Sequence, residues 1–279
     1  FVLVAAFLGA VWLSGASSFD LVGAVGESHL EGALPLPLVR QIILLAGVLL
    51  AFGIKMPLVP FHTWLPDAHV EASTPISVLL AGVLLKLGTY GMLRFGLGLF
   101  PDAWAVAAPW LASWAVVSVL YGASCAIAQK DMKKMVAYSS IAHMGYILLA
   151  SAAATGVSLL GTVLQMVSHG LISALLFLTV GVVYRKSGSR NMDVLRGLFN
   201  PDRGLPMIGS LMIVGVMASA GIPGLAGFIA EFLIFRGSLQ VFPVQTLLCM
   251  IGTGLTSVYF LIMVNRAFFG RLSDLVVSL

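Results

Sequence analysis

The sequence predicts an all-α fold, a polytopic bundle of transmembrane helices. Its 279 residues are 59% hydrophobic and only 9% charged, and the mean hydropathy is +1.05. A soluble domain of this length could not hide so much apolar surface, so lipid must be the solvent for most of the chain. Only helices and closed barrels cross lipid with their backbone groups paired, and the apolar runs are too long and too uniform for barrel strands.

The apolar runs divide into about eight spans. Seven of them cover residues 1–13, 76–99, 105–128, 135–154, 158–184, 206–236 and 242–270. The remaining span starts near residue 40, passes Lys55, is interrupted by Pro57 and Pro60, and continues through residues 64–69. Because the chain opens in mid-span and stops soon after another span, we expect it to be an internal portion of a longer protein.

Two of these spans share an unusual design. The span from residue 40 and the span 206–236 are each about 30 residues long, more than one crossing needs. Each has a proline-containing break near its middle, around 55–61 and 221–224, with Lys55 just before the first break and Glu231 just after the second. Pairs of interrupted helices point to an inverted-repeat transporter and to its ion site. We therefore expect two broken helices within an inverted-repeat bundle.

The charges of the loops predict the orientation. Basic segments at 129–134 and 185–203, and at Arg266 with Arg271, alternate with the uncharged segment 155–158 and with 236–243, whose only charge is Arg236. Lysine and arginine accumulate in cytoplasmic loops, so the basic segments belong on that side. The loop 14–39 falls on the opposite side; its charged residues are Asp20, Glu27 and Glu31.

Lys86 is the most informative residue, because it lies near the middle of the apolar run 76–93. At about 1.5 Å of rise per residue it is too far from either membrane surface for its side chain to reach the headgroups easily, which is the ordinary alternative. A lysine at mid-membrane costs a few kcal/mol and is a functional-site hypothesis by default. We expect Lys86 to bind and release protons.

Four further ionisable residues lie within or at the ends of spans. Lys55 is either an interfacial anchor or a buried charge beside its break, and Glu231 is either an interface acid or a buried one. His143 and His169 are either packed core residues or members of a relay, since a histidine can accept a proton on one nitrogen and donate from the other. No cysteine or aspartate lies at helical spacing from either histidine, so we expect no metal site.

A second group is a candidate channel mouth at the cytoplasmic side. Lys133 either sets orientation or lines the mouth, and His62, Asp67 and His69 either line it or cap a half-helix around Trp64. The sequence shows no nucleotide-binding glycine fingerprint, catalytic triad or cysteine cluster. We therefore expect no catalytic residue, bound cofactor or nucleic-acid partner in this chain, and redox chemistry would have to reside elsewhere.

Several motifs resemble the antiporter-like membrane subunits of respiratory complex I known as chain 4 or subunit M, and their counterpart in the photosynthetic NAD(P)H dehydrogenase-like complex. They are residues 55–72, 84–86, 138–146, 165–170 and 221–231. The string His-Thr-Trp-Leu-Pro-Asp-Ala-His at 62–69 separates this family member from its sister antiporter-like proteins. Residues 241–255 are most similar to cyanobacterial versions, and among them to the variants of carbon dioxide-uptake complexes.

The resemblance implies a protein of about fourteen helices with two inverted repeats of about five helices. Residues 1–99 would end the first repeat, 105–270 would form the second, and 271–279 would start the following loop. The lysine matching Lys55 pairs with a glutamate on a helix absent from this chain. The resemblance also implies a proton path along the axis Lys55–Lys86–His143–His169–Glu231, with Glu231 at the exit or the link to the next subunit. One departure is Ala230, where some relatives have glycine.

The predicted function is therefore that of a proton-translocating subunit in an NAD(P)H- or ferredoxin-driven quinone oxidoreductase. Iron–sulfur clusters and plastoquinone or ubiquinone would belong to other subunits of that enzyme. The expected partners are sister antiporter-like subunits, the lipid bilayer and, in the uptake variant, a carbon dioxide-hydrating subunit. The expected location is a cyanobacterial thylakoid membrane, or otherwise a bacterial inner membrane. Two alternatives remain open: a stand-alone Mrp-type cation/proton antiporter subunit, and a structural spacer that does not pump.

Overall fold

The computed structural model describes residues 1–15, 36–273 and 276 of the chain, and within these ranges every named element is a helix. The helices are α1 (Val2–Ser14), α2 (Leu38–Lys55), α3 (Trp64–Glu71), α4 (Thr74–Leu79), α5 (Leu85–Gly91), α6 (Pro101–Ile127), α7 (Met132–Ala153), α8 (Gly156–Ser187), α9 (Pro206–Ser219), α10 (Ala226–Leu239) and α11 (Pro243–Ala267). Two π-helical turns, Leu80–Leu84 and Met92–Leu97, flank α5 and make 74–97 one continuous helical segment. The prediction of an all-α fold is confirmed.

Six described helical segments are long and apolar enough to cross a membrane: Leu38–Lys55, Thr74–Leu97, Pro101–Ile127, Met132–Ala153, Gly156–Ser187 and Pro243–Ala267. The shorter apolar helices α1 and α9 account for the first predicted span and for half of a broken one. Each of the eight predicted spans thus has its helix or pair of helices. Both predicted breaks are confirmed, because α2 ends at Lys55 before α3 begins, and α9 ends at Ser219 before α10 begins.

The helix ends follow from local sequence chemistry. A proline opens α6, α9 and α11, where its missing N–H costs no hydrogen bond. Asp131 caps α7 by accepting from the backbone N–H groups of Lys133 and Lys134. Thr155 and Ser158 form a capping box at the start of α8, and Gly188 ends that helix with a left-handed conformation at φ 69°.

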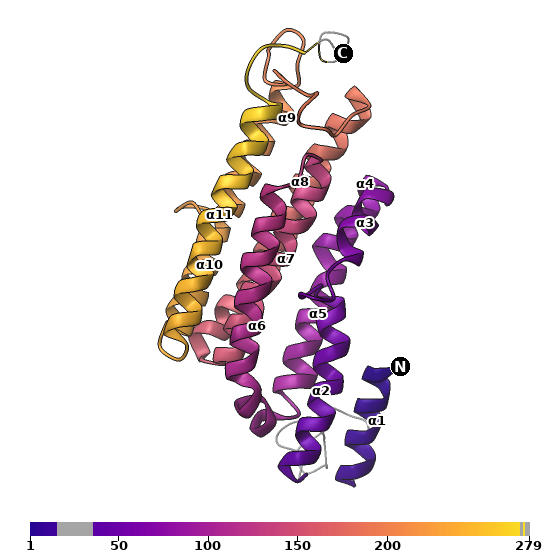
Figure 1. Ribbon diagram of the computed structural model, residues 1–279, viewed down its shortest axis with the longest axis vertical. Coiled ribbons are helices and arrows are strands. Elements are labelled where there is room, and N and C mark those ends of the chain that lie inside the picture. The colour runs from indigo at the N-terminus through magenta and orange to yellow at the C-terminus, as the bar shows by residue number, and fades with distance from the viewer. Residues whose placement is uncertain (16–35, 274–275, 277–279) are drawn as a thin grey trace.

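The helix α7 forms the centre of the bundle. Helices α1, α2 and α5 lie on one side of the α6–α7–α8 layer and α10 and α11 on the other (Figure 1). Nearly every residue of α7 from Met135 to Ala153 is buried. Glycines permit its close approach to α6, since a Cβ at Gly145 would lie 3.1 Å from the carbonyl oxygen of Ala115. A central, fully packed helix is a suitable position for charged or polar groups that must be shielded from lipid.

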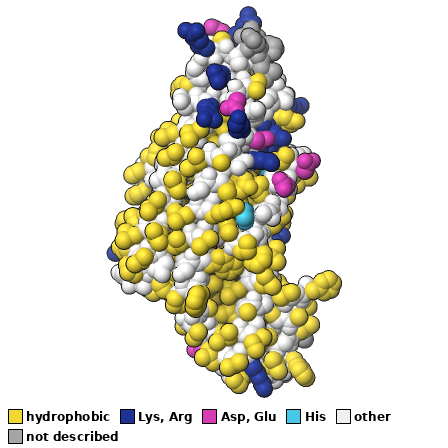
Figure 2. Space-filling view, in the orientation of Figure 1, with side chains coloured by type: hydrophobic (Ala, Val, Ile, Leu, Met, Phe, Trp, Pro, Cys, Tyr) yellow, Lys and Arg dark blue, Asp and Glu magenta, His cyan; other side chains and the backbone are white. Residues whose placement is uncertain are grey.

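The outer surface separates an apolar body from a charged end. Figure 2 shows hydrophobic side chains over most of the length, with most of the charged side chains at the end where α11 finishes. There Lys130 pairs with Asp193 at 2.9 Å and Arg190 with Asp131 at 3.3 Å, joining the two longer basic segments. Arg266 reaches Asp193 at 3.6 Å. The three basic segments therefore share one end of the bundle, as the loop charges predict. The acidic residues expected in the loop 14–39 lie outside the described residues.

Candidate functional site

Lys86 contacts His169 in the interior of the bundle. Its Nζ lies 2.7 Å from His169 Nδ1 and also donates to the carbonyl oxygen of Ala81 at 2.5 Å. Ala81 belongs to the π-helical turn Leu80–Leu84, and such turns are frequent at functional sites. Because a lysine ammonium can only donate, His169 Nδ1 is the acceptor whenever Lys86 is charged. The pair is thus arranged for a proton to pass from the lysine to the histidine.

A second histidine follows directly. The rings of His169 on α8 and His143 on α7 are 5.0 Å apart between centroids and tilted by 57°. Both side chains are almost fully buried, His169 being 3% and His143 2% exposed. The two histidines that the sequence places on successive spans are therefore in contact through their rings.

His143 connects this pair to the break between α9 and α10. Its Nε2 is 3.0 Å from Ser219 Oγ, at the last residue of α9, and its Nδ1 is 3.7 Å from Glu231 Oε1 on α10. The same Nδ1 lies 3.3 Å from Gln165 Nε2. One ring thus contacts both halves of the broken helix, which the loop 220–225 brings to the same place.

Glu231 ends this row of groups and is 4% exposed. Its Oε2 accepts from Thr253 Oγ1 at 3.2 Å, and Thr253 lies 3.3 Å from the hydroxyl of Tyr146. A Cβ at Gly221 would lie 2.8 Å from Oε2, so the bare glycine leaves room for the carboxylate. A cavity of about 480 Å³ begins here and is lined by residues that include Glu231, Thr253, Phe228, Phe232 and Arg236.

The spatial order of the groups corrects the predicted one. The axis inferred from the sequence placed His143 next to Lys86 and His169 next to Glu231, whereas the structure has His169 beside Lys86 and His143 beside Glu231. The reason is packing: the π-helical turn meets α8 at Gly82 and Gly170, where a Cβ on Gly170 would lie 3.0 Å from the Gly82 carbonyl oxygen. This close approach sets the α8 histidine beside the lysine.

Lys86 is half-buried, because a groove of about 510 Å³ with a mostly apolar lining opens beside it. Lys55 is also half-buried, and no ion pair joins it to another described residue. Its aliphatic stem lies against α5, where a Cβ at Gly88 would be 3.1 Å from Lys55 Cγ. The structure therefore places Lys55 against the helix of Lys86 but does not link it to the row by a hydrogen bond.

The predicted mouth residues do not gather at one place. Lys133 is 5% exposed, donates to the carbonyl oxygen of Ala72 at 2.7 Å and lines a polar cavity of about 420 Å³ at the basic end. His69 is fully buried, stacks on Phe177 at 4.3 Å, and neither ring nitrogen has a hydrogen-bond partner among the described residues.

The other two predicted mouth residues, His62 and Asp67, do not line this cavity either. His62 is buried with its ring edge-on to Tyr121 at 5.0 Å. Asp67 lies on the surface, 3.8 Å from Lys134. Of the four predicted residues, only Lys133 therefore stands at an opening, and His69 lies deeper in the bundle.

Sequence reasoning missed four polar residues that contact the row: Gln165, Ser219, Thr253 and Tyr146. Hydroxyl residues are frequent in membrane helices, where they bond their own backbone, so Ser219 and Thr253 carry little signal. The clearest available signal was Gln165, an amide near the middle of an apolar span and one helical turn before His169.

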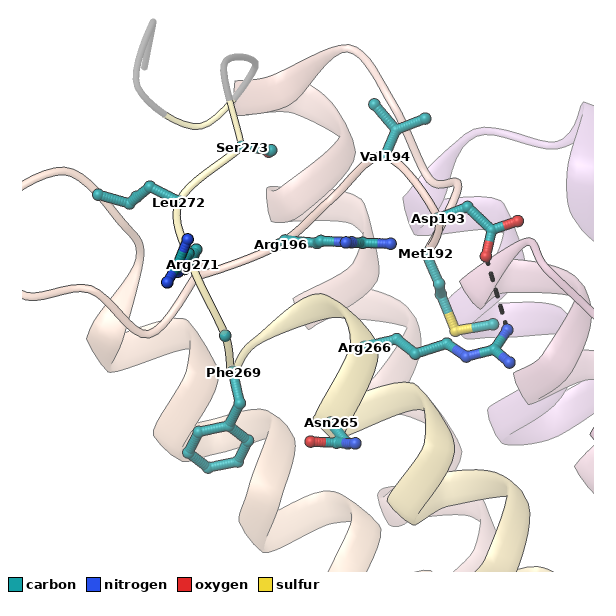
Figure 3. Close-up of a pocket in the computed structure, with 11 residues that line it drawn as sticks. Met192, Asp193, Val194, Arg196, Asn265, Arg266, Phe269, Arg271, Leu272 and Ser273 are labelled. Carbon is teal, nitrogen blue, oxygen red and sulfur yellow. Dashed lines mark ion pairs between the residues drawn. The ribbon is translucent and has the colours of Figure 1, made fainter.

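A separate cavity of about 810 Å³ lies at the basic end, away from the row. It is lined by Asp193, Arg196, Arg266 and Arg271 together with Met192, Val194, Asn265, Phe269, Gly270, Leu272 and Ser273 (Figure 3). The hydrogen bond from Lys130, with the charges of Lys130, Arg266 and Arg196, holds the pKa of the Asp193 carboxyl below its ordinary value. These contacts tie the segment after α8 to the end of α11.

The fold and the buried row define a membrane-embedded helical bundle that carries ionisable groups through its interior. The sequence profile of the family described as NADH:quinone oxidoreductase/Mrp antiporter, TM, matches residues 1–256. The chain belongs to this family.

Individual relatives agree with this assignment. The chain is 42% identical to NAD(P)H-quinone oxidoreductase chain 4 2 of Microcystis aeruginosa, over 97% of this chain and 48% of that protein. It is 43% identical to chain 4 1 of a Nostoc species, over 98% of this chain and 50% of that protein. The chain thus spans about half the length of these curated relatives. The resemblance seen in the motifs, including its cyanobacterial character, is confirmed.

Solved structures place the same fold in larger assemblies. A chain of respiratory complex I from Thermus thermophilus with bound NADH matches with a TM-score of 0.87 and 32% identity, over 98% of this chain and 56% of that one. A chain of the Mrp complex from a Dietzia species matches with a TM-score of 0.84 over 98% of this chain and 50% of that one. Its identity is 23%, so this second likeness shows the fold alone.

Proposed function

We propose that this chain is part of a proton-translocating membrane subunit in an NAD(P)H- or ferredoxin-driven quinone oxidoreductase. The observation that carries the proposal is the row of neighbouring ionisable groups Lys86–His169–His143–Glu231 inside the spans. Ionisable residues within membrane spans are costly and usually mark ion pathways or proton relays. The names of the curated relatives supply the electron acceptor, a quinone, and one of the two proposed donors, NAD(P)H.

In this proposal one excess proton moves along the row. The Lys86 ammonium gives a proton to His169 Nδ1, leaving a neutral amine and an imidazolium. His169 then gives a proton to the neighbouring His143 ring and becomes neutral again. His143 in turn protonates the Glu231 carboxylate, which becomes a neutral acid beside the cavity near Thr253. Each step relocates a single proton between neighbouring groups and needs no other reactant.

Lys55 acts on the first step through its charge. Its stem packs at Gly88, two residues after Lys86 in the same helical segment. A positive charge brought near Lys86 disfavours a second one there and drives the Lys86 proton toward His169. Lys133 and the deeper His69 are the residues that we assign to proton supply from the basic end.

The redox groups belong to other subunits in this proposal. Among the described residues no three His, Cys, Asp or Glu side chains are grouped to hold a metal ion, so no step is routed through a cluster in this chain. The partners are other membrane subunits of the complex, including sister antiporter-like subunits, and the location is a cyanobacterial thylakoid membrane. In its carbon dioxide-uptake form the complex would also copurify with a carbon dioxide-hydrating subunit.

Two other functions make different predictions. A stand-alone Mrp-type antiporter would purify without peripheral redox subunits; the likeness to the Mrp complex concerns the fold alone, and the 62–69 string argues against that class. A non-pumping spacer would have no reason to keep costly charges at Lys86 and Glu231.

The test is proton uptake by sealed vesicles that contain the whole complex with its full-length subunit, with quinone reduction followed in parallel. We expect Lys86→Ala to abolish uptake and Lys186→Ala to leave it unchanged, because Lys186 lies on the exposed last turn of α8. An unchanged number of protons per quinone in Lys86→Ala would overturn the relay and favour the spacer.

A further inference from the structure

Gln165 is the one buried amide among the described residues that contacts the row, and none of the steps above uses it. It lies on α8 one turn before His169, is 2% exposed, and places Nε2 3.3 Å from His143 Nδ1. Its Oε1 accepts from Ser168 Oγ at 3.4 Å. A buried amide is costly unless it is hydrogen-bonded, so both ends of this side chain are used.

The polarity of these hydrogen bonds determines where His143 carries its proton. An amide nitrogen can only donate, so the Nδ1 atom that it faces must be unprotonated. The neutral ring then carries its proton on Nε2, which donates to Ser219 Oγ at 3.0 Å. With the nitrogen toward His143, the Ser168 hydroxyl donates to the amide oxygen at 3.4 Å.

The same Nδ1 atom faces the next member of the row. Glu231 Oε1 lies 3.7 Å from it, whereas Nε2 points to Ser219. A proton can therefore leave for Glu231 only from Nδ1. The Gln165 amide and the transferred proton compete for one nitrogen atom.

We propose that Gln165 is a positioning residue that gates proton transfer from His143 to Glu231. While the amide donates to Nδ1, His143 has no proton facing the carboxylate. A proton that arrives at His143 binds Nδ1, displaces the amide and leaves an imidazolium; that Nδ1 proton then goes to the Glu231 carboxylate, and the ring returns to its Nε2–H form. This inference rests on the proposed proton path.

The experiment reads the tautomer of His143 directly in the assembled complex. The full-length subunit is labelled with nitrogen-15 histidine, and the His143 signals are assigned in solid-state NMR by their loss in His143→Gln. Gln165→Met keeps the length of the side chain and removes the donor, and Gln165→Glu keeps its shape and replaces the donor by an acceptor. Gln129→Met is the matched control, because that amide donates to the Cys125 carbonyl oxygen at the basic end of α6, far from the row.

Wild type is expected to show Nδ1 unprotonated and Nε2 protonated. Loss of one hydrogen bond to the neutral ring changes the ratio of tautomers roughly tenfold, so Gln165→Met gains the Nδ1–H form. Gln165→Glu gains it further, because a carboxylate accepts from Nδ1–H. Both variants lower the number of protons moved per quinone reduced, and Gln129→Met changes neither quantity.

Three results would overturn the gate: a protonated Nδ1 in resting wild type, an unchanged tautomer ratio in the Gln165 variants, or a changed ratio with wild-type pumping. The wild-type spectrum and the Gln165→Glu variant give this answer even where Gln165→Met does not assemble. Failure of the proposed function would look different, because Lys86→Ala and His143→Gln would then pump like wild type.

Discussion

The chain has two helix breaks, one between α2 and α3 and one between α9 and α10, and each places a charged residue at mid-bundle. Among the described residues, only the charge at the second break meets polar side chains that contact it. Glu231 is 4% exposed and contacts Thr253 and His143 through its two carboxylate oxygens. Lys55 is half-buried, and its stem packs on the Gly88 side of α5. The breaks look alike in sequence and differ in what surrounds them.

The difference lies in the neighbouring helices. The α9–α10 break is packed against α7, α8 and α11, which supply His143, Gln165 and Thr253. The α2–α3 break meets α5 and α6; there Ser118 accepts from the Val59 N–H at 3.2 Å and Trp114 donates to the Val59 carbonyl oxygen. These contacts satisfy the exposed backbone of the break rather than the charge of Lys55. Among the described residues, it is the second break whose adjacent helices present side chains that hold its charge.

The largest effect is expected from a conservative substitution of the charged residue at each of the two breaks. Glu231→Asp shortens a side chain whose two oxygens are fixed, and a displacement of about 1 Å in such a constellation costs roughly 100-fold in rate. Lys55→Arg keeps the charge of a side chain that has no ion pair within the described ranges, so we expect a smaller loss of pumping there than in Glu231→Asp. Proton uptake per quinone reduced in sealed vesicles measures both.

The control for a one-methylene change in an acid is Asp102→Glu, on the exposed first turn of α6 and away from the row. Equal losses in Glu231→Asp and Lys55→Arg would show that both charges are held with the same precision. The contrast between the two breaks would then be an accident of which helices the chain contains.

A smaller effect is expected from two glycines within the second break. Gly221 has φ 69° and Gly224 φ 96°, so an alanine at either position is strained by about 1–2 kcal/mol. A Cβ at Gly221 would meet Glu231 Oε2 at 2.8 Å, whereas nothing lies within 4 Å of a Cβ at Gly224. Gly221→Ala should therefore lower pumping by about tenfold through a displacement of less than 1 Å, and Gly224→Ala should lower stability alone.

Thermal unfolding of the purified complex and proton uptake separate the two effects. A similar loss of stability in the two variants would show that both alanines strain the loop. Similar pumping in the two variants would mean that the position of the Glu231 carboxylate does not limit transfer, and it would weaken the role given to this break.

The sequence predicted the parts of this fold that local chemistry determines. Three features depend on nearby residues: the prolines at helix starts, the breaks after Lys55 and before Glu231, and the shared side of the basic loops. The order of His143 and His169 depends instead on which helix packs against the π-helical turn, and no local pattern encodes that choice. Gln165 and Thr253 were missed for the same reason, since a polar side chain acquires a role only from the helix it faces.

The smallest expected effect concerns the basic end, which holds the segment after α8 to α11 without touching the row. The hydrogen bond from Lys130 keeps the pKa of Asp193 below its ordinary value of 3.8, so the ionised carboxylate stabilises the folded segment. A depressed pKa contributes stability above the unfolded value and loses it as the pH falls through the folded one. Asp193→Asn should therefore speed amide exchange at Met192, whose N–H donates to the Lys130 carbonyl oxygen at 2.9 Å, at pH 7, and the effect should fade as the pH drops from 3.8 through the lower folded pKa of Asp193.

Hydrogen exchange of the whole complex measures this as the ratio of variant to wild-type rates, in which the intrinsic pH dependence cancels. The control is Asp202→Asn in the same linker, because that side chain has no ion pair with a described residue. High salt should also reduce the ratio, since these groups are exposed and their attraction is screened. A ratio that stays unchanged as the pH falls well below 3.8, where the folded carboxyl is protonated, would mean that the shape of the Asp193 side chain, rather than its charge, holds the three basic segments together. The basic end of the bundle would then be held together by packing, as the apolar body is.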